Sequence, residues 1–167
     1  MRGDDVKPIL FRGKAINRDS DREYRTNYKN GDWVYGLVSR LYDERFENLP
    51  AEMTNEDGVS GIDVDYRTIG EWTGIEVYQK DSVPNDEGVH PLTQLYEGDI
   101  CELTTFDLND IDYQHIGIIE FVGGAFWFME RGDEGIAVPL CEIGDIQSDL
   151  EILGNIYDNP ELLEVVK

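Results

Sequence analysis

Residues 117–129, Gly-Ile-Ile-Glu-Phe-Val-Gly-Gly-Ala-Phe-Trp-Phe-Met, decide the fold class of this chain. Two runs of β-branched and aromatic residues, Gly117–Val122 and Ala125–Met129, flank the pair Gly123 and Gly124. Two glycines between such runs favour a two-residue hairpin turn, because glycine adopts the positive φ angles that the turn needs. The stretch therefore predicts a β-hairpin.

Other short apolar runs in the C-terminal half predict more strands. These runs are Asp99–Thr104, Gly135–Leu140 and Leu150–Leu153. Five short strands that close on each other would form a small barrel, which removes sheet edges in few residues. After them, Pro160–Val166 predicts at least one helical turn, because Pro suits the first helical position and Asn159 before it is a good cap.

The N-terminal half carries its own strand signals. Pro8–Ala15 and Asp32–Val38 predict two strands, and Asn30-Gly31 predicts a tight turn that pairs them. Further strands are predicted at Ile62–Tyr66 and Thr68–Gly74.

Polar stretches separate these strands. Residues 17–30 are long for a hairpin loop, and the acidic residues 41–61 predict a loop with one helical turn around Pro50–Met53. The resulting fold class is mainly β, with two small β subdomains. We expect an N-terminal β subdomain with long polar loops at 1–80, an acidic linker or insertion at 81–94, and a small β-barrel at 95–167.

The negative charge is concentrated in the second half of the chain. The whole chain has a net charge of −22. Residues 1–80 hold 12 Lys/Arg and 16 Asp/Glu, a net charge of −4, whereas residues 81–167 hold 2 and 20, a net charge of −18. No Lys or Arg lies between Lys80 and Arg131. We therefore expect the C-terminal half to repel nucleic acid phosphates.

Three interpretations of these acids stay open. They keep a small β protein soluble and protect its strand edges, they form a face for a basic partner, or they bind a cation. The exception to the acidity is the segment Arg12–Lys29, which holds Arg12, Lys14, Arg18, Arg22, Arg25 and Lys29. This segment would pair with the acidic half, within one molecule or between copies.

Composition excludes several classes of protein. The 167 residues are 40% hydrophobic and 11% aromatic, which supports a folded core rather than an acidic disordered tail. No apolar run approaches the roughly 20 residues of a membrane span, so no membrane association is expected. The segment Met1–Asp5 is acidic where a signal peptide needs a basic region, so a cytoplasmic location is expected.

No pattern of residues indicates chemistry at a defined site. His90 and His115 lack the spacing of a structural zinc site, and Asp107, Asp110, Asp112 and His115 lack the order of a calcium-binding loop. Cys101 and Cys141 lie in apolar strand patterns, which predicts buried, inert thiols. The run Phe126–Phe128 predicts core packing rather than base stacking. We predict no catalytic, cofactor-binding or metal-binding residue and no cofactor.

Four motifs nevertheless resemble the YopX family of phage and prophage proteins. They are Phe11–Lys14, Gly31–Gly36, Thr68–Gly74 followed by Leu95–Ile100, and the C-terminal run Gly154–Leu163. The resemblance covers about Ile9 to Leu163. It implies a mainly β protein of two subdomains, the second an SH3-like five-stranded barrel, that is encoded by a phage or prophage and self-associates. It implies no reaction and no catalytic residue.

This chain also departs from the family pattern. Residues 79–95 and 19–29 look longer than usual, so contacts made by these loops are not transferred. From the residues themselves, the turn Glu97-Gly98-Asp99 predicts a sharp entry into a strand, with acids accepting hydrogen bonds from backbone N–H groups.

Three functions remain as hypotheses. The first is a non-enzymatic accessory protein of a phage or prophage in the bacterial cytoplasm, which binds itself or a basic host or phage protein. The second is a nucleic-acid-associated regulator that uses residues 12–29. The third is a hydrolase with an unrecognised carboxylate site, because pairs of catalytic carboxylates are recognised only in space.

Overall fold

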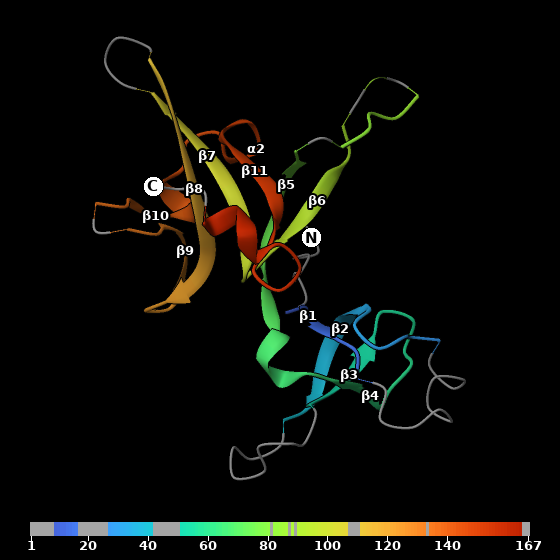
Figure 1. Cartoon of the computed structure of the whole chain (residues 1–167). Helices are drawn as coiled ribbons and strands as arrows, with labels where there is room; N and C mark the ends of the chain where they lie inside the picture. Colours follow the sequence, from blue (N-terminus) through green and yellow to red (C-terminus); the bar gives the residue numbers. More distant parts are fainter. Residues whose placement is uncertain are drawn as a thin grey trace, which may run out of the picture. The chain divides into compact units, whose positions relative to one another are not determined.

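The computed structural model describes residues 9–16, 27–41, 51–80, 82–86, 88, 90–106, 111–132 and 134–164, except the side chain of Ser148. The chain divides into two compact units, Met1–Trp72 and Thr73–Lys167, hereafter unit 1 and unit 2. Strands dominate both units, which confirms the mainly β fold class (Figure 1). The division falls inside strand β5 (Gly70–Gln79). Residues 81–94, the predicted linker, lie in unit 2 and overlap the start of β6 (Leu92–Tyr96).

Unit 1 is an antiparallel arrangement of four short strands and the start of β5. The strands are β1 (Phe11–Lys14), β2 (Trp33–Arg40), β3 (Ala51–Asn55) and β4 (Ile62–Val64), in the order β5-β1-β2-β3-β4. The predicted pairing of the first two is confirmed, and Gly31 in their connection has φ +90°.

One sequence prediction in unit 1 is wrong, and another strand is predicted two residues too long. The helical turn expected around Pro50–Met53 is instead the start of β3, because Met53 and Ala51 alternate with polar residues and point into the core; Pro50 itself lies outside the described residues. The strand expected at Ile62–Tyr66 ends at Val64, and Tyr66 begins the 3-10 turn η1 (Tyr66–Thr68).

Strand β4 returns to the end of β1. Ala15 and Val64 form an antiparallel bridge, and the Ile16 N–H donates to the Asp63 carbonyl at 2.8 Å. The unit thereby encloses a small core, whose fully buried members are Ala15, Val34, Ala51, Met53, Ile62 and Val64. Joining the last strand to the first satisfies backbone groups that an open edge would leave exposed.

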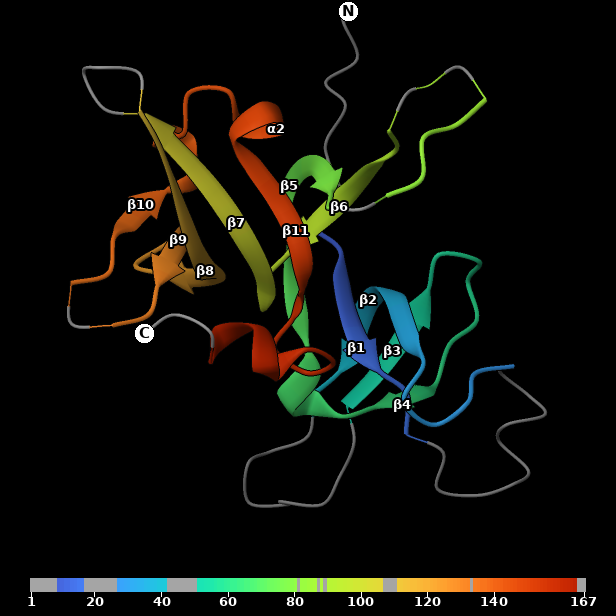
Figure 2. The same cartoon turned by 45° about the horizontal axis from the view of Figure 1, so that its top comes forward.

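Unit 2 contains the remaining strands. They are β6, β7 (Asp99–Phe106), β8 (Asp112–Val122), β9 (Ala125–Glu130), β10 (Ala137–Pro139) and β11 (Leu150–Asn155). Their order is β10-β9-β8-β7-β11-β5, with β6 paired to β5. Strand β11 is antiparallel to β7 and parallel to β5 (Figure 2). Between β10 and β11 lie η2 (Leu140–Glu142) and the single turn α2 (Ile146–Asp149), and η3 (Pro160–Leu163) follows β11.

The β8–β9 hairpin is confirmed, with Gly123 at φ +63° and Gly124 at φ +90°. The C-terminal helical turn is also present, as η3, but Asn159 makes no side-chain cap hydrogen bond to it. The Asn159 Oδ1 instead accepts from the Asn155 N–H at 3.3 Å. The pairings found among the described residues do not confirm closure of a five-stranded barrel.

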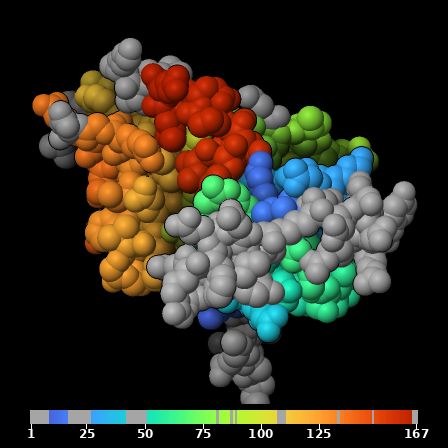
Figure 3. All heavy atoms as spheres, turned by 60° about the horizontal axis from the view of Figure 1, so that its bottom comes forward, coloured from blue at the N-terminus to red at the C-terminus, as the bar shows by residue number. Residues whose placement is uncertain are grey.

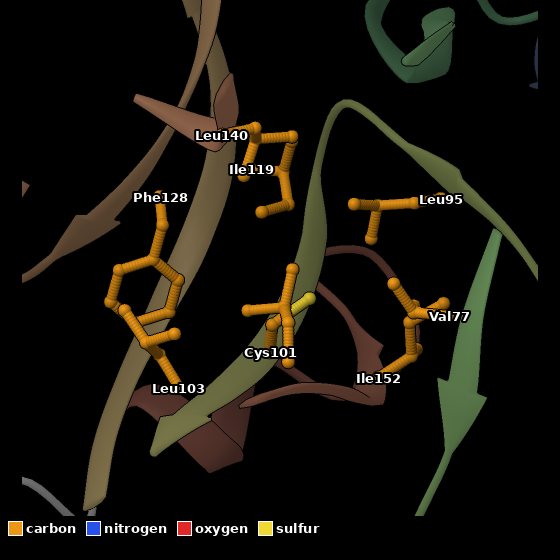
Figure 4. Close-up of a cluster of buried hydrophobic side chains, with 9 residues drawn as sticks. Val77, Leu95, Cys101, Leu103, Ile119, Phe128, Leu140 and Ile152 are labelled. Carbon is orange, nitrogen blue, oxygen red and sulfur yellow. The ribbon is translucent and has the colours of Figure 1, made fainter. Parts of the chain in front are cut away.

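The core of unit 2 lies between its strands and connecting turns. Its buried side chains come from β5 to β9, β11 and η2, and all but Leu150 are labelled in Figure 4: Val77, Leu95, Cys101, Leu103, Ile119, Phe128, Leu140, Leu150 and Ile152. Ile119 and Phe128 are directly opposite each other on β8 and β9. The hairpin therefore contributes one face to this core.

A buried turn, Glu97–Asp99, joins three parts of unit 2. The Asp99 side chain, in a residue only 2% exposed, accepts a hydrogen bond from the Tyr96 N–H at 2.8 Å. Gly98, at φ +83°, donates from its N–H to the Ile119 carbonyl, and its own carbonyl accepts from the Ile156 N–H. The predicted role of an acid in this turn is confirmed for Asp99.

A capped turn holds η1 in unit 1. The Asp65 Oδ1 accepts from the Arg67 N–H at 3.0 Å, and Arg67 Nη2 lies 2.6 Å from Asp65 Oδ2. These hydrogen bonds from Arg67 hold the pKa of Asp65 below its ordinary value.

We predict that Asp99→Ala lowers the free energy of unfolding by about 1–3 kcal/mol, because the buried Tyr96 N–H loses its acceptor. Asp99→Asn keeps an amide oxygen in place and should cause a smaller loss. Urea unfolding followed by circular dichroism measures both, with the exposed Asp112→Ala as control. Equal losses for Ala and Asn would contradict this role.

We also predict an acid-sensitive contribution from Asp65. A carboxyl group whose pKa is lower in the folded state stabilises the fold above its unfolded pKa, and this contribution disappears as the pH falls through the folded pKa. Asp65→Asn should therefore flatten the fall in stability below about pH 4. Arg67→Gln should do the same, since it removes the partner. Unchanged slopes in urea midpoint against pH would refute the assignment.

Candidate functional site

His115 forms a polar bridge inside unit 2. Its Nε2 lies 3.1 Å from the Thr105 Oγ1, and its Nδ1 lies 3.1 Å from the Glu130 Oε2. The same Glu130 oxygen accepts from the Ile136 N–H at 3.1 Å. Since these residues come from β7, β8, β9 and the β9–β10 connection, the bridge ties adjacent strands together. These hydrogen bonds give His115 a structural role.

Of the four residues considered for a cation, two lie within the described residues, Asp112 and His115. Asp112 is exposed on β8, whereas Asp107 and Asp110 lie outside the described residues. Within the part of the chain that the structure describes, no group of three or more His, Cys, Asp or Glu residues is placed to hold a metal ion.

His90 pairs with a serine that the sequence did not single out. The Ser82 Oγ lies 3.0 Å from the His90 Nδ1, and the Tyr78 ring meets the imidazole edge-on at a centroid distance of 6.4 Å. Nucleophilic catalysis by serine also needs a third group that orients the histidine, and hydrogen-bond donors that stabilise an oxyanion. The Ser82–His90 pair by itself therefore does not indicate catalysis. The pair lies at the surface, in the connection between β5 and β6, and its hydrogen bond suits the ordering of that connection.

The two cysteines differ in their surroundings. Both are free. Cys101 is fully buried in the core, as predicted. Cys141 is exposed, so its predicted burial is wrong. The apolar run before Cys141 ends at Leu140, where the chain leaves β10 and enters η2, and the thiol turns out of the core.

Cations and an aromatic ring meet on one face of β1 and β2 in unit 1, where Arg12 is buried and Lys14 and Trp33 are half-buried. The Arg12 guanidinium lies 4.7 Å from the centroid of the Trp33 ring, and the Lys14 Nζ lies 5.2 Å from it. Arg12 is opposite Tyr35 in the pairing of the two strands, so Tyr35 shares this face. Cation–π contacts of this kind stabilise the pair of strands and place aromatic and basic groups together. Of the predicted basic segment Arg12–Lys29, residues 17–26 lie outside the described residues.

Unit 2 carries almost all of the net negative charge. Residues 73–167 hold 3 Lys/Arg and 21 Asp/Glu, a net charge of −18. Of the three cations, Lys80 is paired with Glu102 at 2.7 Å, and Arg131 is exposed beyond β9. The described surface of unit 2 therefore has a strongly negative potential.

An apolar end of the β8–β9 hairpin interrupts this acidic surface. We call it the hairpin end and define it as Phe121, Val122, Phe126 and Trp127. Phe121 is 46% exposed and Val122 is 48% exposed. The predicted core role of Phe126–Phe128 is confirmed for Phe128, which is fully buried, whereas Phe126 and Trp127 are half-buried. The sequence pattern alone does not distinguish these positions. Only the inner half of the hairpin packs on the core, and its end extends past the core.

Comparison with known proteins finds one family. The family model described as YopX protein matches residues 24–164. No curated protein and no solved structure matches the chain. In addition, within the described residues no helix is long and apolar enough to cross a membrane.

Proposed function

The chain belongs to the YopX family, and from this membership and the charge of unit 2 we propose a non-enzymatic protein-binding module, encoded by a phage or prophage and acting in the bacterial cytoplasm. Its task is to associate with itself or with a basic host or phage protein. The observation that carries the proposal is the net charge of −18 over residues 73–167. A surface of one sign steers and selects partners of the opposite sign.

We also propose that unit 2 contains an SH3-like barrel. Strands β7 to β10 follow one another as neighbours, and β11 returns after η2 to pair with β7. A meander of four strands whose fifth strand returns to the first supports an SH3-like barrel. Such small barrels serve many functions, so the surface rather than the fold identifies the partner.

Self-association would use the uneven charge of the chain itself. Unit 1 holds 11 of the 14 Lys/Arg residues, including the segment Arg12–Lys29. The basic segment of one copy would meet the acidic unit of another. Such an association weakens with added salt, because exposed charges are screened.

A second function is supported by Lys14, Trp33 and Tyr35, which lie on one face of β1 and β2, whereas Arg12 on the same face is buried. Proteins that bind single-stranded nucleic acid combine aromatic side chains, on which bases stack, with cations along the backbone path. Tyr35 is 37% exposed on this face. The near balance of charge in unit 1 permits such binding there, whereas unit 2 opposes it.

We predict that the full chain binds a fluorescein-labelled peptide of alternating Lys and Ser, about 12 residues long, at about 20 mM salt, and that binding weakens about tenfold or more at about 300 mM salt. Glu120→Gln with Glu142→Gln should weaken binding about twofold to threefold, and the exposed Glu56→Gln in unit 1 should not. Fluorescence anisotropy measures these affinities. Equal binding of a Glu–Ser peptide would refute the acidic-face proposal.

For the second function, single-stranded DNA of about 20 nucleotides should bind the chain, and Tyr35→Ala should weaken it about fivefold, because stacking contributes roughly 1 kcal/mol or more per base. Tyr66→Ala is the matched control, since Tyr66 is also an exposed tyrosine of unit 1, at 51%. The same anisotropy assay applies. Absence of binding at tens of micromolar protein would remove this function.

A further inference from the structure

We propose that Lys80 is a strap that holds strand β11 between β5 and β7, and that loss of the Lys80 charge loosens β11 locally. This conformational device lies within unit 2 and goes beyond the proposed binding function. All of the residues that carry it are described residues of that unit.

The Lys80 side chain reaches across β11. Lys80 directly follows the end of β5, and its Nζ lies 2.7 Å from the Glu102 Oε1 on β7. Strand β11 lies between β5 and β7 in the sheet (Figure 2). Since neighbouring strands are about 4.8 Å apart, the lysine spans two strand spacings. The ion pair therefore joins the two neighbours of β11 over one face of the sheet.

The pairing that the strap supports is short. Strand β11 is parallel to β5 over two pairs of residues, Glu151 with Tyr78 and Ile152 with Gln79. Directly after them, the Lys80 N–H donates to the Ile152 carbonyl at 2.9 Å. Figure 3 shows that the last described residues, drawn in red, are open at the surface of unit 2. A short pairing near the surface opens more readily than a pairing in the core.

Like charges on β11 and β7 increase the importance of the strap. Glu151 is directly opposite Glu102 in the pairing of these strands. Like charges directly opposite each other in a sheet are destabilising. Lys80 bonds to Glu102, whose side chain is only 12% exposed. The Lys80 charge therefore also offsets the repulsion between β11 and β7, so both neighbours of β11 depend on it.

No other described cation of unit 2 is placed to replace Lys80. Residues 73–167 hold three Lys and Arg residues, which are Lys80, Arg131 and Lys167. Arg131 follows β9, and β8 and β7 lie between β9 and β11 in the sheet. Lys167 lies outside the described residues. The hold on β11 therefore depends on one side-chain charge, which added salt screens and acetylation of the amine removes.

Hydrogen exchange followed by NMR tests the strap, because the N–H of residue 80 reports on the pairing of β5 with β11. We expect Lys80→Gln to lower the protection factor of this amide about fivefold, and Lys80→Arg, which keeps the charge, to leave it within about twofold. The Gly98 N–H, which donates to the Ile119 carbonyl at 2.9 Å, is the internal control. Arg131→Gln is the matched control variant, because it removes the same charge from unit 2.

A double-mutant cycle tests the ion pair itself. Glu102→Gln should lower the protection of residue 80 about twofold to threefold, less than Lys80→Gln does, because it also removes the repulsion from Glu151. Adding Glu102→Gln to Lys80→Gln should cause no further loss. Losses that multiply would overturn the strap, since the two side chains would then act independently.

Salt provides a test on the wild-type chain, where no substitution disturbs the fold. Raising the salt from about 20 mM to about 500 mM should lower the protection of residue 80 about threefold and leave Gly98 unchanged. The strap is refuted if Lys80→Gln leaves the protection of residue 80 unchanged, or if salt has no effect on it. An equal loss at residue 80 and Gly98 is a global loss of stability and refutes the strap as well.

Discussion

The buried turn Glu97–Asp99 is the constraint on which the rest of unit 2 depends. Its Asp99 carboxylate satisfies the Tyr96 N–H, where β6 ends and β7 begins. Through Gly98 the same turn is hydrogen-bonded to Ile119 of β8 and to Ile156 after β11. Strand β7 is thereby positioned between β8 and β11, and β8 and β9 contribute Ile119 and Phe128 to the core. An unsatisfied buried N–H at this point would loosen all of these elements together.

In unit 1, the last strand is held by pairing with the end of the first strand. The short β4 returns to β1 through the Ala15–Val64 bridge, and the Asp65 cap and its bond to Arg67 hold the chain as it leaves β4. Here one face of β1 and β2 places the half-buried Lys14 and Trp33 beside the exposed Tyr35, whereas unit 2 carries a surplus of acids with an apolar hairpin end. The two units thus present surfaces of different chemistry, which is the physical basis for assigning them different partners.

Local signals predicted the elements that local interactions form. Alternating or β-rich runs beside Gly pairs identified the β1–β2 and β8–β9 hairpins, and Pro160 marked the final helical turn. Strand β3 was missed, because a neighbouring proline and a surrounding acidic stretch outweighed the short alternation at Ala51 and Met53. The first half of β8 was missed as well. Asp112–Gln114 are exposed and show no alternation of buried and exposed residues, and they form a strand because they pair with β7.

The amino-acid sequence by itself determined that the chain is mainly β, that its charge is divided unevenly, and that its motifs resemble the YopX family, because these properties follow from short-range pattern and composition. Tertiary structure alone decided that His115 bridges Thr105 and Glu130, that Cys141 faces outward, and that Phe121 extends past the core which Phe128 fills. Burial and pairing of this kind depend on residues far apart in the chain, and identical apolar residues differ only in what packs over them.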